Sequence, residues 1–236
     1  MTRNSIQNRV MSVVSRITEA ELHYQRKKNS VKLLAVSKTQ EITALEQAIS
    51  AGLRHFGENY LQDALAKITY FANLADCPAL EWHFIGPIQS NKTNKIANNF
   101  NWVHSVDRIA IAERLSRQRS NHLAALNICI QVNIDHAAQK AGIHASECLE
   151  LAQQIKQLPG LKLRGLMAVP EPNTELTQQR QPFRQIFELF TALNKHGMDL
   201  DTLSMGMSSD LDAAIAEGST MVRIGTDIFG PRKYAK

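Results

Sequence analysis

The sequence predicts an α/β fold, a single (β/α)8 TIM barrel with an additional N-terminal helix. Two observations lead to this prediction: short apolar runs alternate strictly with helical patterns, and the alternation yields eight strand-like runs. Strict alternation implies parallel strands joined by right-handed crossovers, and eight such units in about 200–250 residues match this barrel. An open doubly wound sheet would fit the same alternation, but no Gly-x-Gly-x-x-Gly segment follows the first strand to support it.

Hydrophobic spacing places each element. Between Asn4 and Tyr24, the residues Ile6, Val10, Val13 and Ile17 recur every three or four positions, which predicts a helix ahead of the first strand. The eight strands are expected at Val31–Ser37, Arg54–Phe56, Trp82–Ile85, Trp102–Ser105, Asn127–Ile134, Lys162–Val169, Thr202–Ser204 and Met221–Ile224. The helices between them are expected near Ile42–Ile49, Tyr60–Asn73, Asn91–Asn98, Asp107–Arg119, Ser146–Leu158, Phe183–Lys195 and Leu211–Glu217.

No internal linker interrupts this pattern, so we expect residues 1–236 to form one domain. The longest polar stretch, Glu171 to Gln181, contains Pro172 and ends before Pro182. Proline and polar residues are typical of loops. We therefore predict a mobile loop after the sixth strand.

Composition excludes several classes of protein. With 44% hydrophobic and 21% charged residues among 236, the chain is not a disordered one. No apolar run reaches the roughly 18 residues of a membrane helix, and Arg3, Arg9 and Arg16 interrupt any secretory signal. The three cysteines form no Cys-x-x-Cys pair, which is typical of reduced thiols. We expect a cytoplasmic protein with no membrane partner.

The charge balance does not favour a nucleic-acid partner. The net charge is only +5, and the basic residues are scattered. The one dense run, Arg26-Lys27-Lys28, ends the first predicted helix, where cations favour the helix C-terminus. A small anionic ligand fits the mild basic excess at least as well.

Polar and ionisable residues gather where the predicted strands end, which is where barrels of this type carry their chemistry. Lys38 follows the first strand on the same face as Leu34 and Val36. If these two residues point into the barrel, Lys38 points inward at its mouth. Partial desolvation there would lower its pKa and free the amine to attack a carbonyl, giving a Schiff base. A lysine that extends to the rim without a role fits the same parity.

Arg223 points to a ligand inside the barrel. Its neighbours Val222 and Ile224 share one face of the last strand, so Arg223 lies on the other. An unpaired buried guanidinium costs several kcal/mol, so a partner should accept from it. The candidates are a carboxylate, Glu58 or Asp107, or a ligand heteroatom.

The loops after the seventh and eighth strands could hold a phosphate, as these loops often do in such barrels. Ser208, Ser209 and Asp210 open one helix, and Gly225 with Thr226 offers a close backbone approach and a hydroxyl. Ser209 or Asp210 could instead act simply as a helix cap.

Three other kinds of site are not expected. The eight histidines form no His-Glu-x-x-His motif, and no His, Cys or Asp pair has ligand spacing, so we predict no metal site. No Gly-x-Ser-x-Gly nucleophile elbow is present. His83 is interpreted as a hydrogen-bonded histidine of the core or the barrel mouth rather than a functional residue.

Six ordered motifs spread over nearly the whole chain resemble the pyridoxal phosphate homeostasis protein family (YggS/PROSC-like). In chain order they are Ala35–Thr39, Phe56–Tyr60, Trp82–Lys92, Arg164–Ala168, Ser204–Asp210 and Gly218–Thr226, the last running on to Gly230. The resemblance implies a barrel similar to the N-terminal domain of alanine racemase, with pyridoxal 5′-phosphate (PLP) as cofactor.

The resemblance also implies roles for single residues. Lys38 would attach PLP covalently as a Schiff base, and Arg223 would face the pyridine nitrogen. The phosphate would be held by Ser208, Gly225 and Thr226, and Asn59 would lie beside the ring. No departure from the family's motifs is seen at these positions.

A guanidinium against the pyridine nitrogen leaves it unprotonated, so the ring is a weak electron sink. Related racemases take a second acid/base from an extra β-domain, and the sequence ends six residues after Gly230, so we expect no such domain here. The expected function is PLP homeostasis within vitamin B6 metabolism, in which the protein buffers and carries the cofactor. We expect little or no turnover. The expected recipients of the cofactor are PLP-dependent apo-enzymes. The alternative is a Schiff-base enzyme on the same barrel, racemase-like or class I aldolase-like, and a weak racemase-like activity stays open.

Overall fold

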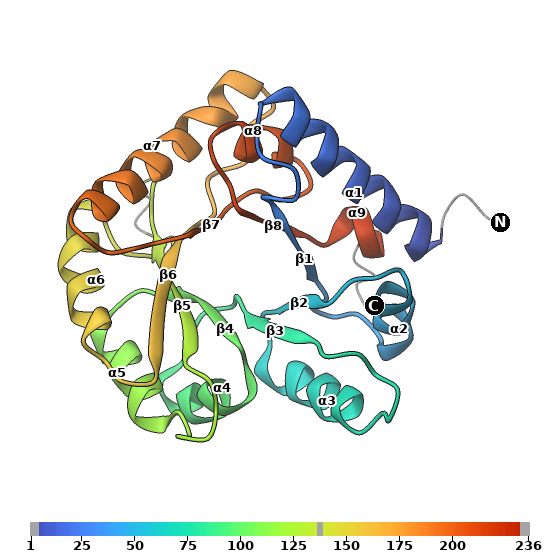
Figure 1. Ribbon diagram of the computed structural model, residues 1–236, viewed down its shortest axis with the longest axis horizontal. Helices are drawn as coiled ribbons and strands as arrows, with labels where there is room; N and C mark the ends of the chain where they lie inside the picture. Colours follow the sequence, from blue (N-terminus) through green and yellow to red (C-terminus); the bar gives the residue numbers. More distant parts are fainter. Residues whose placement is uncertain (1–4, 136–138, 232–236) are drawn as a thin grey trace.

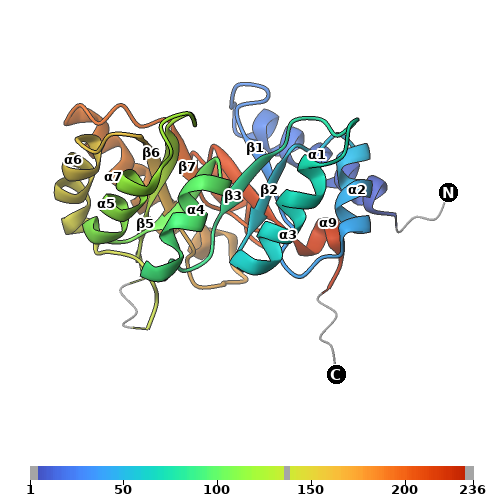
Figure 2. The same cartoon turned by 90° about the horizontal axis from the view of Figure 1, so that it is seen from below.

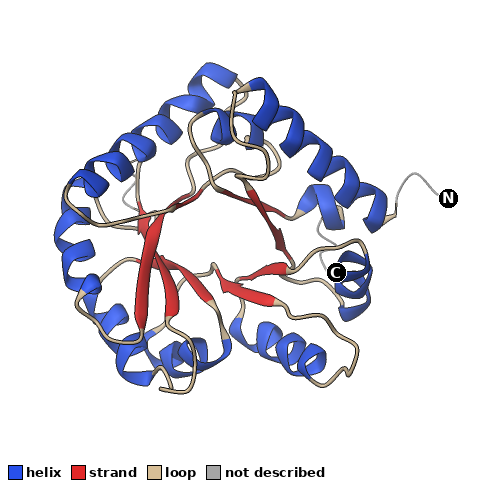
Figure 3. Ribbon diagram, viewed as in Figure 1, coloured by secondary structure: helices blue, strands red, loops and turns tan. Residues whose placement is uncertain are grey.

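Eight parallel strands close into a barrel wrapped by helices in the computed structural model, which describes residues 5–135 and 139–231 (Figure 1). The strands follow one another in chain order, and the last pairs with the first. In that closing pair, Leu34 lies opposite Arg223. The predicted (β/α)8 barrel with an extra N-terminal helix is therefore confirmed, and Figure 3 shows the strands inside and the helices outside.

All eight predicted strands are present, within a few residues of their expected bounds. The strands are β1 Lys32–Val36, β2 His55–Glu58, β3 Glu81–Phe84, β4 Trp102–Val106, β5 Leu126–Val132, β6 Leu161–Ala168, β7 Thr202–Ser204 and β8 Met221–Ile224. The helices are α1 Ile6–His23, α2 Ile42–Ser50, α3 Leu61–Ala72, α4 Thr93–Asn99, α5 Ile109–Gln118, α6 Cys148–Lys156, α7 Leu176–Lys195, α8 Leu211–Ala216 and α9 Thr226–Phe229. Two short 3-10 turns precede α4 and α6, at Ser90–Lys92 and Ala145–Glu147. Asn4, the expected start of the first helix, lies outside the described residues.

The predicted loop at 171–181 is partly wrong, because α7 begins at Leu176 and contains Pro182. A proline removes one backbone donor and usually ends a helix. Here Pro182 is the seventh residue of α7, and the apolar face that packs on the barrel starts one residue later, at Phe183. The first turns of α7 are exposed and polar, so their sequence lacks the apolar spacing that reveals a helix.

Side chains that point outward from the strands make the main core. Phe56 of β2 and Trp82 of β3 lie 5.6 Å apart, and Phe71 of α3 lies 6.2 Å from Trp82 (ring centroids). Figure 2 shows the helices flanking the strands on both sides. In the described ranges, no helix has the length and apolar character needed to cross a lipid bilayer.

The barrel interior is only partly apolar. Trp102, Cys129 and Met167 form a separate buried cluster there. His83, His104 and Arg223 are also buried, and each is discussed below with its partners. Cys77, Cys129 and Cys148 are free thiols, as predicted from their spacing.

Candidate functional site

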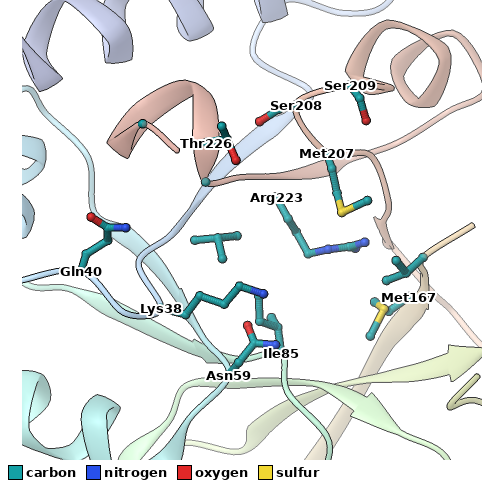
Figure 4. A pocket seen from close by; sticks show the side chains of 14 residues that line it. Lys38, Gln40, Asn59, Ile85, Met167, Met207, Ser208, Ser209, Arg223 and Thr226 are labelled. Atoms are coloured by element: carbon teal, nitrogen blue, oxygen red, sulfur yellow. The ribbon is translucent and has the colours of Figure 1, made fainter. Parts of the chain in front are cut away.

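A cavity of about 540 Å³ opens at the end of the barrel where the strands finish. Its size falls within the roughly 300–1,000 Å³ typical of small-molecule sites. All six residues singled out from the sequence line it: Lys38, Asn59, Ser208, Arg223, Gly225 and Thr226. In Figure 4, Lys38 and Asn59 lie on one side, the Ser208 and Thr226 hydroxyls lie on the other, and Arg223 lies between them.

Lys38 is half-buried and follows the end of β1 by two residues. Leu34 and Val36, which share its parity, point inward. Val36 lines the cavity, and the Leu34 side chain packs beside Gly57 of the neighbouring strand β2. The next residue, Thr39, has φ 63°. A β-branched residue in the left-handed region is a strained one, and such strain is concentrated at functional sites.

A buried network fixes the strand end that carries Lys38. Ser37 Oγ donates to Glu58 Oε1 at 2.6 Å, and Lys67 Nζ donates to the same oxygen at 2.9 Å. Lys67 Nζ also donates to the carbonyl of Ser37 at 2.8 Å. Burial raises the pKa of Glu58, while the Lys67 ammonium opposes that rise. Because Ser37 precedes Lys38, this network sets the direction in which the lysine leaves the strand.

Arg223 is buried, but neither predicted carboxylate accepts from it. Its Nη1 donates to the Ser204 carbonyl and, at 2.8 Å, to Ser204 Oγ, while Nη2 donates to the Ala168 carbonyl at 2.8 Å. Glu58 faces Lys67 instead, and Asp107 pairs with Arg108. Among the described residues no carboxylate lies within ion-pair distance of Arg223, so its charge is solvated by oxygen dipoles.

Burial lowers the pKa of Arg223 to about 10, and Asp210 partly offsets this effect. The guanidinium is therefore still charged near neutral pH. A buried cation held only by neutral acceptors favours an anion or an electron-rich atom in the adjacent cavity.

A chain of hydrogen-bonding groups runs below Arg223 through the barrel. Ser204 Oγ lies 2.8 Å from His104 Nδ1, and His104 Nε2 lies 3.0 Å from His83 Nδ1. Burial, with the nearby Arg223 charge, lowers the pKa of His104 to about 3, and burial also lowers that of His83 well below its usual value. Both imidazoles are therefore neutral. The interpretation of His83 as a hydrogen-bonded core histidine is confirmed.

The loops after β7 and β8 meet at Ser208. The backbone N–H of Asp227 donates to Ser208 Oγ at 3.4 Å. Arg16 of α1 donates from Nη1 to the Ser208 carbonyl at 2.9 Å and from Nε to Asp212 Oδ2 at 3.0 Å. Figure 1 shows α1 lying across α8 and α9, so the N-terminal helix holds this loop from outside.

Asp210 occupies the cap position of α8 that the sequence suggested as its alternative role, but it does not make the cap hydrogen bond. Its Oδ1 instead accepts from the backbone N–H of Met207 at 2.5 Å. Asp210 therefore closes the turn before the helix, and this leaves Ser208 and Ser209 facing the cavity.

Asn59 presents a buried acceptor to the cavity. Its Oδ1 receives no hydrogen bond from any residue in the described part of the chain. Backbone packing fixes its position, because a Cβ added at Gly86 would lie 2.3 Å from the Asn59 carbonyl oxygen. An unpaired buried oxygen is costly unless a ligand donates to it.

The sequence missed several lining residues: Val36, Gln40, Ile85, Met167, Val169, Met207, Ser209 and Gly230 were not assigned to the site. Strand parity could have found Val36, Ile85 and Met167, since each points inward near a strand end. Ser209 was considered as part of the phosphate loop or as a helix cap, but it was not among the assigned site residues. No pattern marks Gln40, because a loop side chain has no fixed parity.

Comparisons with known proteins find relatives that match nearly the whole chain. The family model of the alanine racemase N-terminal domain matches residues 17–233. The pyridoxal phosphate homeostasis protein of Pseudomonas aeruginosa is 54% identical over 231 residues, covering 98% of this chain and 97% of that one. The protein of the same name from Escherichia coli K12 is 48% identical, with 99% of each chain covered. The structure of PipY from Synechococcus elongatus with PLP bound matches with a TM-score of 0.78 and 37% identity, covering 91% of this chain and all of that one.

Proposed function

The chain belongs to the pyridoxal phosphate homeostasis protein family, within the alanine racemase N-terminal domain family, and we propose that it binds PLP in the cavity at the barrel mouth. In this role it buffers and carries the cofactor for vitamin B6 homeostasis, with little or no turnover of its own. The observation that carries the proposal is the convergence of an amine, a guanidinium and hydroxyls from β1, β7 and β8 in one cavity.

The lining residues fit the chemical groups of PLP. Its aldehyde needs a primary amine, its phosphate needs hydroxyl and N–H donors, and its flat ring needs apolar walls. Lys38 supplies the amine, Ser208 and Thr226 supply hydroxyls, and Ile85 and Met207 are among the apolar residues. The unpaired Asn59 Oδ1 can accept from a phenol hydroxyl.

We propose that Lys38 Nζ is the point of covalent attachment. PLP supplies an electrophilic aldehyde, and a lysine amine binds such a group reversibly. The Ser37–Glu58–Lys67 network orients the strand end for this contact. Gly225 lets the backbone approach the phosphate closely, and Ser208, tied to α1 through Arg16, contributes a fixed hydroxyl.

Arg223 would face the ring nitrogen, and this limits the chemistry. A guanidinium donates a hydrogen bond but does not give up its proton at neutral pH. It therefore keeps the ring nitrogen unprotonated and weakens the ring as an electron sink. Binding and release are favoured over turnover.

The test is the absorption spectrum of the purified protein, followed by borohydride reduction and peptide mass spectrometry. We expect a yellow protein whose label is on Lys38. Lys38→Ala should be folded and colourless, and the control Lys95→Ala, at an exposed lysine of α4, should keep the colour. A covalent label that persists in Lys38→Ala would refute the attachment site.

Assays of alanine racemisation and aldol cleavage separate the carrier from the alternative enzyme. We expect little or no turnover, and an efficient rate in either assay would overturn the carrier role. We also propose that residues 1–236 act as one domain in the cytoplasm and that PLP-dependent apo-enzymes receive the cofactor. Reactivation of an apo-enzyme by the yellow protein, compared with its Lys38→Ala variant, tests this transfer.

A further inference from the structure

Three potential metal ligands meet at the end of the barrel opposite the cavity. His55 is the first residue of β2 and Glu81 is the first of β3, and the two strands pair with these residues opposite each other. His83 lies two residues further along β3 and therefore has the same parity as Glu81. The strand register, rather than the spacing along the chain, brings His55, Glu81 and His83 together.

The three ligating atoms have the spacing of a tetrahedral site. His55 Nδ1 lies 3.3 Å from Glu81 Oε2 and 3.4 Å from His83 Nε2, and His83 Nε2 lies 3.8 Å from Glu81 Oε2. Zinc bonds of about 2.0–2.1 Å place tetrahedral ligands about 3.3–3.4 Å apart. Two of the three edges already have this length, and a small rotation of His83 or Glu81 closes the third.

The donor atoms suit a cation. Two imidazole nitrogens and one carboxylate oxygen are ligands that Zn²⁺ accepts in proteins. Glu81 adds a negative charge. The exposed ammonium of Lys32 is the group that opposes a cation here, since its charge acts on both histidines.

The surroundings orient the ligands. Trp102 Nε1 donates to Glu81 Oε2 at 3.1 Å, and the Trp102 ring stacks on His83 with centroids 5.4 Å apart. His83 uses its other nitrogen, Nδ1, toward His104 Nε2 at 3.0 Å. Metal-bound histidines characteristically donate their second N–H to such a partner, which fixes the tautomer and the ring plane.

The site is open to solvent on one side. The side chain of His83 is fully buried, but those of His55 and Glu81 are 25% and 44% exposed. An ion can therefore enter past these two residues and keep a water molecule as fourth ligand, which is the arrangement of three-ligand zinc sites.

We propose that His55 Nδ1, Glu81 Oε2 and His83 Nε2 bind a divalent transition-metal ion, of which Zn²⁺ fits best, at the end of the barrel remote from the cavity. The sequence prediction of no metal site considered ligand spacing along the chain. It did not consider ligands shared between neighbouring strands.

Calorimetric titration of untagged full-length protein with Zn²⁺ tests the proposal, because a polyhistidine tag would itself bind the ion. We expect one Zn²⁺ per chain. His55→Ala and Glu81→Gln should each weaken Zn²⁺ binding at least about tenfold. Loss of a residue that only hydrogen-bonds a metal ligand already lowers metal affinity by about 10–100-fold, and the loss of a ligand itself should cost no less. Both positions are partly exposed, so these variants should fold. His122→Ala, at an exposed histidine outside the cluster, is the matched control and should bind as the parent does.

A second readout places the ion in space. The chain has two tryptophans, so Trp82→Phe leaves Trp102 as the sole reporter. Co²⁺ should quench its fluorescence in this variant and should do so far less when Glu81→Gln is added. Lys38→Ala should bind Zn²⁺ like the parent, which separates this site from cofactor binding. Absence of one-to-one binding, or binding unchanged in His55→Ala or Glu81→Gln, would overturn the proposal.

Discussion

Arg223 and Ser204 meet inside the barrel, where Arg223 Nη1 donates to Ser204 Oγ at 2.8 Å. The same hydroxyl lies 2.8 Å from His104 Nδ1. One small side chain of β7 therefore links the cation at the floor of the cavity with the neutral histidines below it. The Ser204 hydroxyl therefore contributes hydrogen bonds to two buried side chains at once.

We expect Ser204→Ala to lower the free energy of unfolding by about 1–3 kcal/mol, because it leaves the buried His104 Nδ1 without its partner and removes one of the two acceptors of Arg223 Nη1. Urea unfolding of the two proteins measures the difference. Ser15→Ala, which removes an exposed hydroxyl of α1, is the control and should change stability by less than about 0.5 kcal/mol. Equal effects of the two substitutions would show that the link contributes nothing.

Stability should fall in acid because of the buried histidines. The pKa of His104 is lowered from 6.5 to about 3 in the folded state, so the unfolded chain takes up a proton that the folded protein does not. The contribution of the neutral His104 to the free energy of unfolding is fully present above pH 6.5. It decreases as the pH falls below 6.5 and is lost completely near pH 3. The slope is up to about 1.4 kcal/mol per pH unit for each such histidine.

Urea unfolding between pH 7 and pH 5 measures this slope. His104→Asn should make it shallower, whereas His122→Ala, at an exposed position, should leave it unchanged. A slope that His104→Asn does not alter would contradict a neutral His104 in the folded protein.

Arg16→Ala should weaken the hold on the phosphate of PLP. The substitution removes the hydrogen bond to the Ser208 carbonyl and the contact with Asp212, and so frees the loop after β7. We expect the affinity for PLP to fall severalfold and that for pyridoxal, which lacks the phosphate, to change little. Equilibrium titration with both compounds measures the ratio, with Arg117→Ala on the exposed face of α5 as control. A parallel loss for both compounds would mean that Arg16 acts on the whole fold.

Gly86→Ala should displace Asn59. The added methyl would lie 2.3 Å from the Asn59 carbonyl oxygen, so the β2–α3 loop must move away from the cavity. We expect weaker PLP binding together with a loss of stability. Gly52→Ala is the comparison: no atom lies within 4 Å of its added Cβ, although φ is 98° there. It should reduce stability and leave PLP affinity unchanged, and an unchanged affinity in Gly86→Ala as well would refute the positioning role of Gly86.

Much of the barrel was predictable because strands and helices have distinct hydrophobic periods. The eight strands follow from short apolar runs, and the inward direction of Lys38 and Arg223 follows from parity. The start of α7 was missed because its first turns are exposed and carry no apolar face. The partners of Arg223 were also missed, since the backbone carbonyls of Ser204 and Ala168 leave no trace in the sequence.

The functional sites likewise include residues that the sequence could reveal and residues that it could not. Lys38 and the lining residues of the loops after β7 and β8 could be singled out because strand ends gather at one rim of a barrel. The cluster of His55, Glu81 and His83 depends on the pairing of β2 with β3, so spacing along the chain could not reveal it. Register between strands carries information that a linear pattern lacks.

A line of polar groups runs from one end of the barrel to the other, from His55 through His83, His104 and Ser204 to Arg223. Each neutral imidazole in this line can donate from only one of its two nitrogens, so the tautomer of His83 and that of His104 depend on each other. A substitution at either histidine therefore reassigns the donors and acceptors of its neighbour as well.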